Sequence, residues 1–126
     1  MRQLDIILRE VSDYLGISIN DIKSKTRNKS TVAARQIAIY LSRKYTKCSL
    51  HVIGDYYNKH HASVLYSQKA INNHLTYDKF LQNDISIISK KIENILINNT
   101  VLSETLNYIK YKQITHYSTG FLGYKY

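Results

Sequence analysis

Three cations at alternate positions, Lys25, Arg27 and Lys29, stand in the hydrophilic run KSKTRNKS, directly before a long apolar pattern. Ammonium and guanidinium groups bind phosphate oxygens, so this run predicts contact with a polyanion. Nine of the 18 lysines and arginines lie between residues 21 and 60, where only two carboxylates accompany them. The net charge of +9 is therefore concentrated in one patch, for which nucleic acid is the first partner to consider and a merely solvated lysine-rich surface the alternative.

A second group of candidate functional residues lies in the run NKHHASV and consists of His60, His61, Ala62 and Ser63. Short side chains in the first turn of a recognition helix contact base edges in the DNA major groove. Neighbouring histidines also suggest zinc, but no cysteine or carboxylate stands at ligand spacing. A serine nucleophile with a histidine base is poorly supported too, because no glycine elbow or orienting carboxylate accompanies the pair. We therefore expect no metal, no cofactor and no enzyme activity.

Two short helices must position this second group. Ser49 is placed to cap a helix over Leu50 to Tyr57, Asn58 and Lys59 make a tight connection, and another helix runs from His61 to about Asn73. The residues that this other helix is expected to bury are Val64, Leu65 and Ile71. Two helices across so short a connection predict a helix-turn-helix.

A longer helix must carry the cations of the first group. Its apolar residues share one face at about 100° per residue, and they are Ala34, Ile37, Ala38, Leu41 and Tyr45. Arg35 and Arg43 fall on the opposite face. We expect these two arginines, together with Lys59 from the tight connection, to extend the cationic surface that meets the anion.

The rest of the sequence predicts supporting helices. Apolar residues recur at helical spacing over residues 7–15, and a short helix is expected over residues 19–22. A sixth helix is expected from a repeat with steps of four and three, formed by Leu81, Ile85, Ile88, Ile92 and Ile95. A weaker seventh helix is expected over residues 101–112 and a flexible tail over residues 116–126. The predicted class is all-α, with a helix-turn-helix domain of about six helices.

Length and composition favour one soluble domain. A chain of 126 residues is long enough for a single modest core. The single cysteine, Cys48, excludes an intramolecular disulfide and is typical of a reducing cytosol. No apolar run approaches the roughly 18 residues of a membrane span, and the N-terminus has no signal-peptide pattern. We expect a soluble protein of the cytoplasm.

Three segments in order, VAARQIAIYLSR, SLHVIG and HHASVLYSQKAI, together resemble one known family. That family is the C-terminal DNA-binding domain of the bacterial replication initiator DnaA. The first segment is similar to a helix of that domain that opens with an Ala-Arg-Gln type segment. The second is similar to the Ser-Leu-Pro-x-Ile-Gly entry into the helix-turn-helix, and the third to the Asp-His-Thr-Thr-Val recognition helix. The resemblance covers roughly residues 4 to 96, and residues after about 98 have no counterpart in it.

The resemblance implies a fold of the DnaA domain IV type, similar to the Trp repressor, that binds short boxes of double-stranded DNA. It implies that Arg27 enters the minor groove and that His61 is the recognition histidine in the major groove. The cations that it assigns to the DNA backbone are Lys25, Lys29, Arg35 and Arg43. It divides the chain into a DNA-binding domain over residues 1–97 and an extension of unknown role over residues 98–126.

The recognition turn departs from the family pattern. His60 stands where the family has an aspartate, so an acceptor suited to the amino group of cytosine is replaced by a group that can donate to guanine. Ala62 and Ser63 replace two threonines, Asn58 stands where the family usually has two glycines, and His51 takes the place of the signature proline. The recognised DNA sequence is therefore expected to differ from the ordinary box.

The leading hypothesis is sequence-specific binding of double-stranded DNA at sites related to DnaA boxes, as a replication accessory or regulator. The sequence contains no GxxxxGK[ST] loop, so nucleotide binding, ATPase activity and duplex opening are not expected of it. The alternative is a protein-interaction module in which the helix over residues 81–96 or the C-terminal tail binds a protein, with DNA affinity weak or lost. Nonspecific RNA binding ranks last, because the usual RNA-module signatures are missing.

Overall fold

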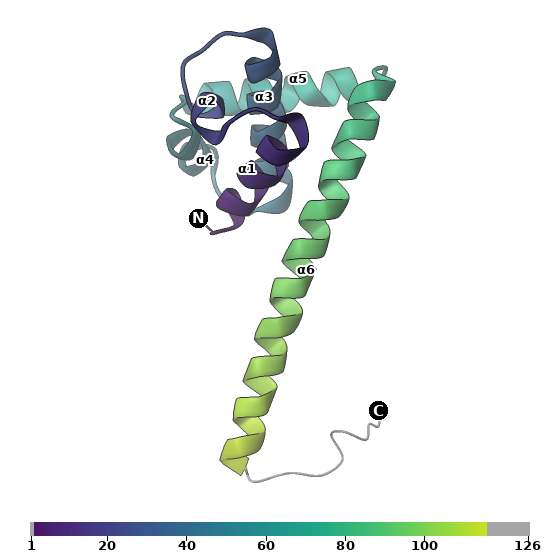
Figure 1. Ribbon diagram of the computed structural model, residues 1–126. Helices are drawn as coiled ribbons and strands as arrows, with labels where there is room; N and C mark the ends of the chain where they lie inside the picture. Colours follow the sequence, from purple (N-terminus) through teal and green to yellow (C-terminus); the bar gives the residue numbers. More distant parts are fainter. Residues whose placement is uncertain (1, 116–126) are drawn as a thin grey trace. The chain divides into compact units, whose positions relative to one another are not determined.

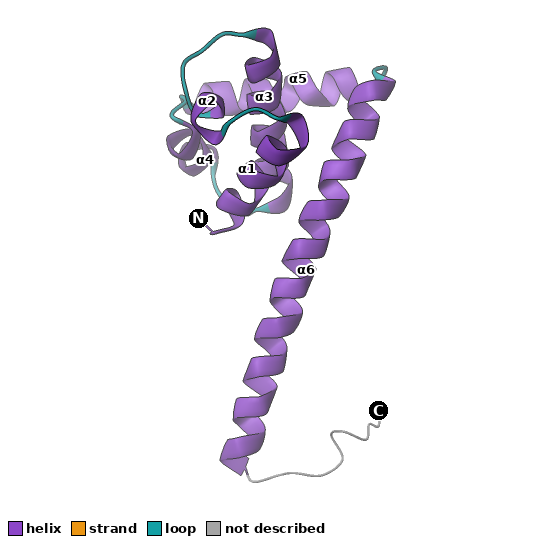
Figure 2. Ribbon diagram, in the orientation of Figure 1, coloured by secondary structure: helices purple, strands orange, loops and turns teal. Residues whose placement is uncertain are grey.

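The computed structural model describes residues 2–115, and over that range the chain forms helices and no strand (Figure 2). Figure 1 labels the helices in chain order, which are α1 (Arg2–Leu15), α2 (Ile19–Ile22), α3 (Lys29–Tyr45), α4 (Leu50–Tyr57), α5 (His61–Leu75) and α6 (Lys79–Thr115). The predicted all-α class is confirmed. Within the described range no helix is long and apolar enough to cross a membrane. The expected flexible tail lies outside the described residues.

Helix α3 is the central helix, because it contacts α1, α2, α4 and α5. Its buried apolar residues are Ala34, Ile37, Ala38, Ile39 and Leu41. Asn28 caps its N-terminus, and the side-chain oxygen accepts hydrogen bonds from the backbone N–H of Ser30 (3.0 Å) and Thr31 (3.4 Å). The cap starts α3 directly after the basic loop, which we define as residues 23–28. That loop is therefore anchored to the most buried helix of the domain.

Helices α4 and α5 form the predicted helix-turn-helix. Ser49 caps α4, and Asn58 ends it with φ 58° and ψ 43°, a left-handed conformation that asparagine tolerates better than most residues. The backbone N–H of Lys59 then donates to the carbonyl oxygen of Gly54 at 2.8 Å. A Cβ atom on Gly54 would lie 2.6 Å from the carbonyl oxygen of Lys59, so the turn closes this tightly only over a glycine.

The buried face of α5 differs from the expectation at one position. Val64, Ser67 and Ile71 are buried, but Leu65 is 40% exposed. Residues three and four apart share a helix face, whereas Leu65 lies about 100° around the helix from Val64. The buried face is therefore narrower than the sequence suggested, and the outer face of α5 begins at Leu65.

Helix α6 runs unbroken from Lys79 to Thr115, so the predicted sixth and seventh helices form one element. The run INNT between them contains no glycine or proline, and asparagine and threonine lower helix propensity by only about 0.7 kcal/mol each. The chain divides into two compact units, one ending at Glu93 and the other beginning at Asn94. In the first unit, α6 packs through buried isoleucines, and the Tyr14 hydroxyl donates to Asp84 at 2.9 Å.

Candidate nucleic-acid interface

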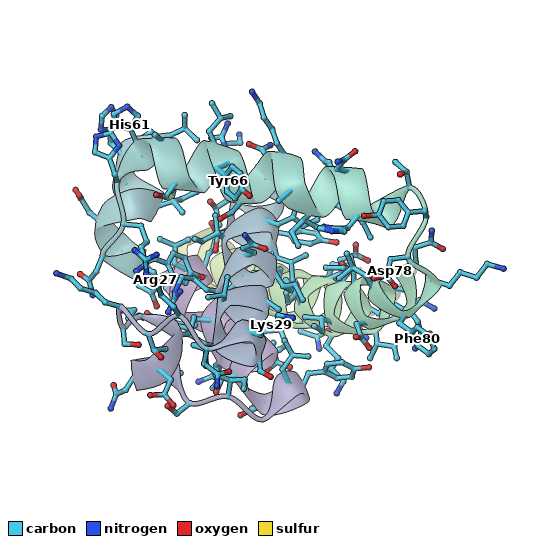
Figure 3. The ribbon with its side chains drawn as sticks, turned by 90° about the horizontal axis from the view of Figure 1, so that it is seen from above. Arg27, Lys29, His61, Tyr66, Asp78 and Phe80 are labelled. Carbon is cyan, nitrogen blue, oxygen red and sulfur yellow. The ribbon has the colours of Figure 1, made fainter. Side chains whose placement is uncertain are left out.

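The basic loop and the start of α3 present exposed cations. Lys25, Arg27 and Lys29 are all exposed, and Figure 3 shows Arg27, Lys29 and His61 in one view. The N-terminus of a helix carries partial positive charge, so cations there are unfavourable by about 0.3–1 kcal/mol each at low ionic strength. An anion bound at this point would remove that penalty. The arrangement is therefore suited to phosphate rather than to an isolated surface.

Arg35 lies beneath the basic loop, and only 7% of its surface is exposed. Its Nε donates to the carbonyl oxygen of Ile22 at 2.7 Å. Its Nη2 lies within hydrogen-bonding distance of three more carbonyl oxygens, those of Asp21 (3.3 Å), Ser24 (2.9 Å) and Thr26 (3.2 Å). Placing Arg35 on a solvent-facing side of α3 was wrong, because the basic loop folds over that side. The guanidinium holds the loop in shape instead of extending the exposed surface.

Two hydrogen bonds tie the basic loop to the turn between α4 and α5. The Lys59 ammonium donates to the carbonyl oxygen of Ser24 at 3.1 Å, and the Asn58 side-chain amide donates to that of Lys23 at 3.4 Å. The Lys23 ammonium itself sits 3.8 Å from the ring centroid of Tyr56 on α4. These contacts connect the loop that carries Arg27 to the turn that precedes His61.

The cations around this connection repel one another. The pKa of Lys59 is lowered, first by desolvation and then by the positive charges of Arg35, Lys25 and Arg27. Burial also lowers the pKa of Arg35, although a guanidinium stays charged at neutral pH. Holding these positive charges close together costs free energy, and a bound anion offsets that cost by neutralising them. Clusters of this kind therefore mark candidate binding sites.

His60 caps the N-terminus of α5. Its Nδ1 accepts a hydrogen bond from the backbone N–H of Ala62 at 3.1 Å. A nitrogen that accepts carries no proton, so in this arrangement the ring N–H is at Nε2, where it can donate. His60 is exposed, as are Ala62 and Ser63 in the same turn. The turn therefore offers one ring donor, one methyl group and one hydroxyl.

His61 lies at the centre of a group of three imidazole rings. Its ring centroid is 4.1 Å from that of His60 and 4.2 Å from that of His51 on α4. Its pKa is lowered by desolvation first and then by His60 and His51. His61 is therefore neutral at pH 7. Among the described residues there is no group of three or more histidine, cysteine, aspartate or glutamate side chains arranged to hold a metal ion.

Arg43 is half-buried at the far end of α3. Its Nη1 donates to the carbonyl oxygen of Cys48 at 3.2 Å, which braces the connection from α3 to α4, and its Nε is buried without a hydrogen-bond partner. The structure thus brings Lys25 and Arg27 close to Lys59, which lies in the turn before α5, whereas Lys29 begins α3. Arg43 joins α3 to the following connection and is not part of the basic loop.

Two exposed residues on the outer face of α5 are not among the DNA-binding residues predicted from the sequence. Tyr66 is 67% exposed and Lys69 is also exposed. At about 100° per residue both lie on the side of α5 opposite the buried Val64, one and two turns beyond Ala62. Their spacing could have identified them: Tyr66 is four residues after Ala62 and Lys69 three residues further, and residues three or four apart share one helix face. They continue the polar and cationic surface of the recognition turn along the helix.

Residues 4–71 match the family model of the bacterial dnaA protein helix-turn-helix. The chain belongs to this DnaA family. The matched segment contains the basic loop, α3, α4 and most of α5, which are the elements that position the candidate interface. Its all-helical arrangement around a helix-turn-helix is that of DnaA domain IV, a DNA-binding domain linked to replication initiation.

Several chromosomal replication initiator proteins DnaA are similar to this chain. The protein of Flavobacterium psychrophilum is 38% identical over 90 residues, which cover 71% of this chain and 19% of that protein. The protein of a Thermoanaerobacter species is 35% identical over 88 residues, covering 70% and 20%. The protein of Desulfotalea psychrophila is 38% identical over 85 residues, covering 68% and 18%. The chain thus spans about a fifth of the length of these DnaA proteins.

Proposed function

We propose that this chain binds double-stranded DNA with sequence specificity, at sites related to DnaA boxes. The observation that carries the proposal is the pair of hydrogen bonds from Asn58 and Lys59 to carbonyl oxygens of the basic loop. A protein that reads two neighbouring grooves must hold its two contacting elements at a fixed separation. These bonds link the loop with Arg27 to the helix that starts at His61.

In this proposal the basic loop contacts the minor groove and the DNA backbone. Arg27 is exposed on the loop and is assigned to the minor groove, where arginine is the favoured side chain. The cations assigned to phosphates are Lys25, Lys29, Arg43 and Lys59. Arg35 has a positioning role, since its guanidinium is already hydrogen-bonded to carbonyl oxygens of residues 21–26.

The first turn of α5 is assigned to the major groove. His61 and Ser63 supply polar contacts, and the methyl group of Ala62 can contact thymine. The Nε2–H of His60 can donate to guanine O6 or N7 while its Nδ1 keeps the cap on α5. One ring nitrogen of His60 thus caps α5 while the other is the proposed donor to guanine.

We assign the chain to the regulation of replication, as an accessory that binds DNA without ATPase activity, duplex opening or bound nucleotide. Its relatives carry the name chromosomal replication initiator protein, and the matched region is their DNA-binding helix-turn-helix rather than a catalytic domain. Residues 98–126 are proposed as an extension to the DNA-binding domain of residues 1–97. The proposed location is the bacterial cytoplasm, on the nucleoid.

In vitro selection from a random duplex pool tests the proposal. We expect enrichment of one short box, followed by tighter binding of that box than of a scrambled duplex with the same composition. Salt must be held constant, because nonspecific phosphate contacts alone give strong binding at low ionic strength. Equal affinity for the selected and scrambled duplexes would refute sequence-specific binding.

The second candidate function is a protein-interaction module. Phe80, at the start of α6, is 86% exposed, and Tyr77 just before it is also exposed. Exposed aromatic side chains are enriched at protein interfaces. This candidate gains support if selection returns no consensus and if Phe80→Ser leaves DNA binding unchanged.

A further inference from the structure

Helix α6 carries an apolar repeat that continues beyond Glu93, where the first compact unit ends. Its positions alternate in steps of four and three. Eight of them are apolar, namely Leu81, Ile85, Ile88, Ile92, Ile95, Leu102, Leu106 and Ile109, and two are polar, Asn99 and Gln113. The backbone is helical through Thr115, so all of them are helical positions. A strict period of seven residues keeps one stripe in contact only when two helices wind around each other.

The two parts of the repeat differ in what surrounds them. Ile85, Ile88 and Ile92 are buried within the first unit. In the second unit the described residues form a single helix, from Asn94 to Thr115. Within the described part of this unit there is no second element against which an apolar stripe can pack, and isolated helices are marginal in water.

We propose that residues 95–113 pair with the same segment of a second copy of this chain, as a parallel two-stranded coiled coil. In this register Asn99, Leu106 and Gln113 occupy a positions and Ile95, Leu102 and Ile109 occupy d positions. In a parallel pair each a residue meets the same residue of the partner, so Asn99 meets Asn99. In an antiparallel pair it would meet an apolar d residue.

Asn99 also decides the number of strands. The isoleucines at d with leucine at a would by themselves favour three or four helices, whereas a single asparagine at an a position fixes register and oligomeric state at some cost in stability. The flanking e and g positions are compatible with a parallel pair. Asn98 is placed opposite Ser103 of the partner and Thr105 opposite Lys110, so neither pairing sets like charges together.

Pairing would give each assembly two helix-turn-helix units. Fewer than three heptads make a weak coiled coil, so monomer and dimer should exchange at moderate concentration. On a duplex with two suitably spaced boxes, the second unit would bind at high effective concentration. The pairing itself does not depend on DNA, and its test can therefore fail or succeed independently of the proposed DNA-binding function.

The mass of the full-length chain in solution tests the pairing, by light scattering over a concentration series. We expect the mass to rise toward twice that of one chain, and Leu106→Lys, at an a position, to remain monomeric. Asn107→Lys is the matched control, because it adds the same charge at the neighbouring b position. Thermal unfolding of both variants checks that the first unit stays folded. A wild-type chain that stays monomeric, or equal behaviour of the two variants, would overturn the proposal.

Disulfide trapping tests the parallel register. Asn99→Cys and Asn107→Cys are each made with Cys48→Ser, which removes the chain's own cysteine. In a parallel pair the two residues at position 99 face each other within disulfide distance, and those at position 107 do not. Mild oxidation should therefore give a covalent dimer for Asn99→Cys at several-fold higher yield. Equal yields, or a mass above that of a dimer, would contradict a parallel two-stranded pair.

Discussion

At the scale of single residues, Arg35 is the main determinant of the basic loop's conformation. Arg35→Ala removes four hydrogen bonds to carbonyl oxygens and leaves those carbonyls beside a cavity. We expect a loss of roughly 2 to 4 kcal/mol in the free energy of unfolding, measured by urea denaturation. Binding to all duplexes should weaken, because the loop that carries the cations is no longer held.

Lys29→Ala is the matched control for Arg35, since Lys29 is exposed. Its unfolding free energy should change by less than about 0.5 kcal/mol, while its binding to cognate and scrambled duplexes falls by similar factors. If Arg35→Ala matched Lys29→Ala in both stability and binding, Arg35 would be a phosphate contact after all.

His60 combines a cap with a proposed base contact, and two substitutions separate these roles. His60→Ala removes the cap of α5 and should lower the unfolding free energy by about 1 kcal/mol. His60→Asp keeps a capping oxygen, so its stability should equal or exceed that of the wild type. In vitro selection with this variant should return cytosine instead of guanine at the contacted base. The preference for the selected base over the other should be roughly 1 to 3 kcal/mol. An unchanged consensus would argue against the placement of α5 in the major groove.

His61 predicts a pH dependence of stability. Its pKa is lowered in the folded chain by desolvation, His60 and His51, so the unfolded chain binds the proton more readily. Its contribution is therefore complete above about pH 6.5, the ordinary histidine value, and is lost as pH falls through the folded pKa. Unfolding free energies measured between about pH 7.5 and 5 should fall more steeply for the wild type than for His61→Gln. Parallel curves for the two proteins would exclude this coupling.

At the scale of elements, the sequence predicts best where the deciding signals are local. The bounds of α4 are those expected, because Ser49 and Asn58 flank it and cap it themselves. The burial of Arg35 and the exposure of Leu65 depend on other segments, namely the loop that covers α3 and the narrow face of α5 that packs inward. Helical periodicity describes one helix at a time, so it does not report the loop that covers Arg35, and it leaves open how wide the buried face of α5 is.

The predicted interface likewise combines features that the local sequence indicates with contacts that it does not indicate. Lys25, Arg27 and Lys29 are exposed as a charge cluster in a hydrophilic loop should be. The hydrogen bonds of Asn58 and Lys59 to the loop join residues that are 35 apart in sequence, and no spacing pattern reports such a contact. The cap formed by His60 was also unforeseen, since histidine is not a preferred capping residue.

The turn between α4 and α5 predicts a strong effect of a single methyl group. Gly54→Ala would set a Cβ 2.6 Å from the carbonyl oxygen of Lys59, so the turn must open. We expect a loss of roughly 2 kcal/mol in unfolding free energy and weaker DNA binding, because Lys59 then moves from the basic loop. Denaturation and duplex titration measure the two effects.

Gly16→Ala provides the comparison for Gly54. Gly16 has φ +71° but no atom within 4 Å of an added Cβ, so the cost is only backbone strain of about 1 to 2 kcal/mol. Gly16 lies between α1 and α2, away from the helix-turn-helix in sequence, and DNA affinity should be retained when the chain is folded. Equal losses of affinity in both variants would mean that the α4–α5 turn does not position the interface.

At the scale of the whole molecule, the number of cations that meet phosphate determines the salt dependence. With Arg35 engaged internally and Arg27 assigned to the minor groove, four cations remain for phosphates, and they are Lys25, Lys29, Arg43 and Lys59. The slope of the logarithm of the binding constant against the logarithm of salt concentration should then be about −3.6. Removing Lys25 should make the slope shallower by about 0.9. A flat response would remove the phosphate contacts from the proposal.

Every hydrogen bond by which Arg35, Asn58 and Lys59 hold the basic loop ends on a main-chain carbonyl oxygen. A carbonyl oxygen is present whatever amino acid occupies the position. The side chains at positions 25 and 27 can therefore be exchanged, by natural drift or by design, while the loop keeps its conformation. In the proposed DNA complex, single substitutions at these two positions would therefore change the contacts of the loop and leave the rest of the domain unaltered.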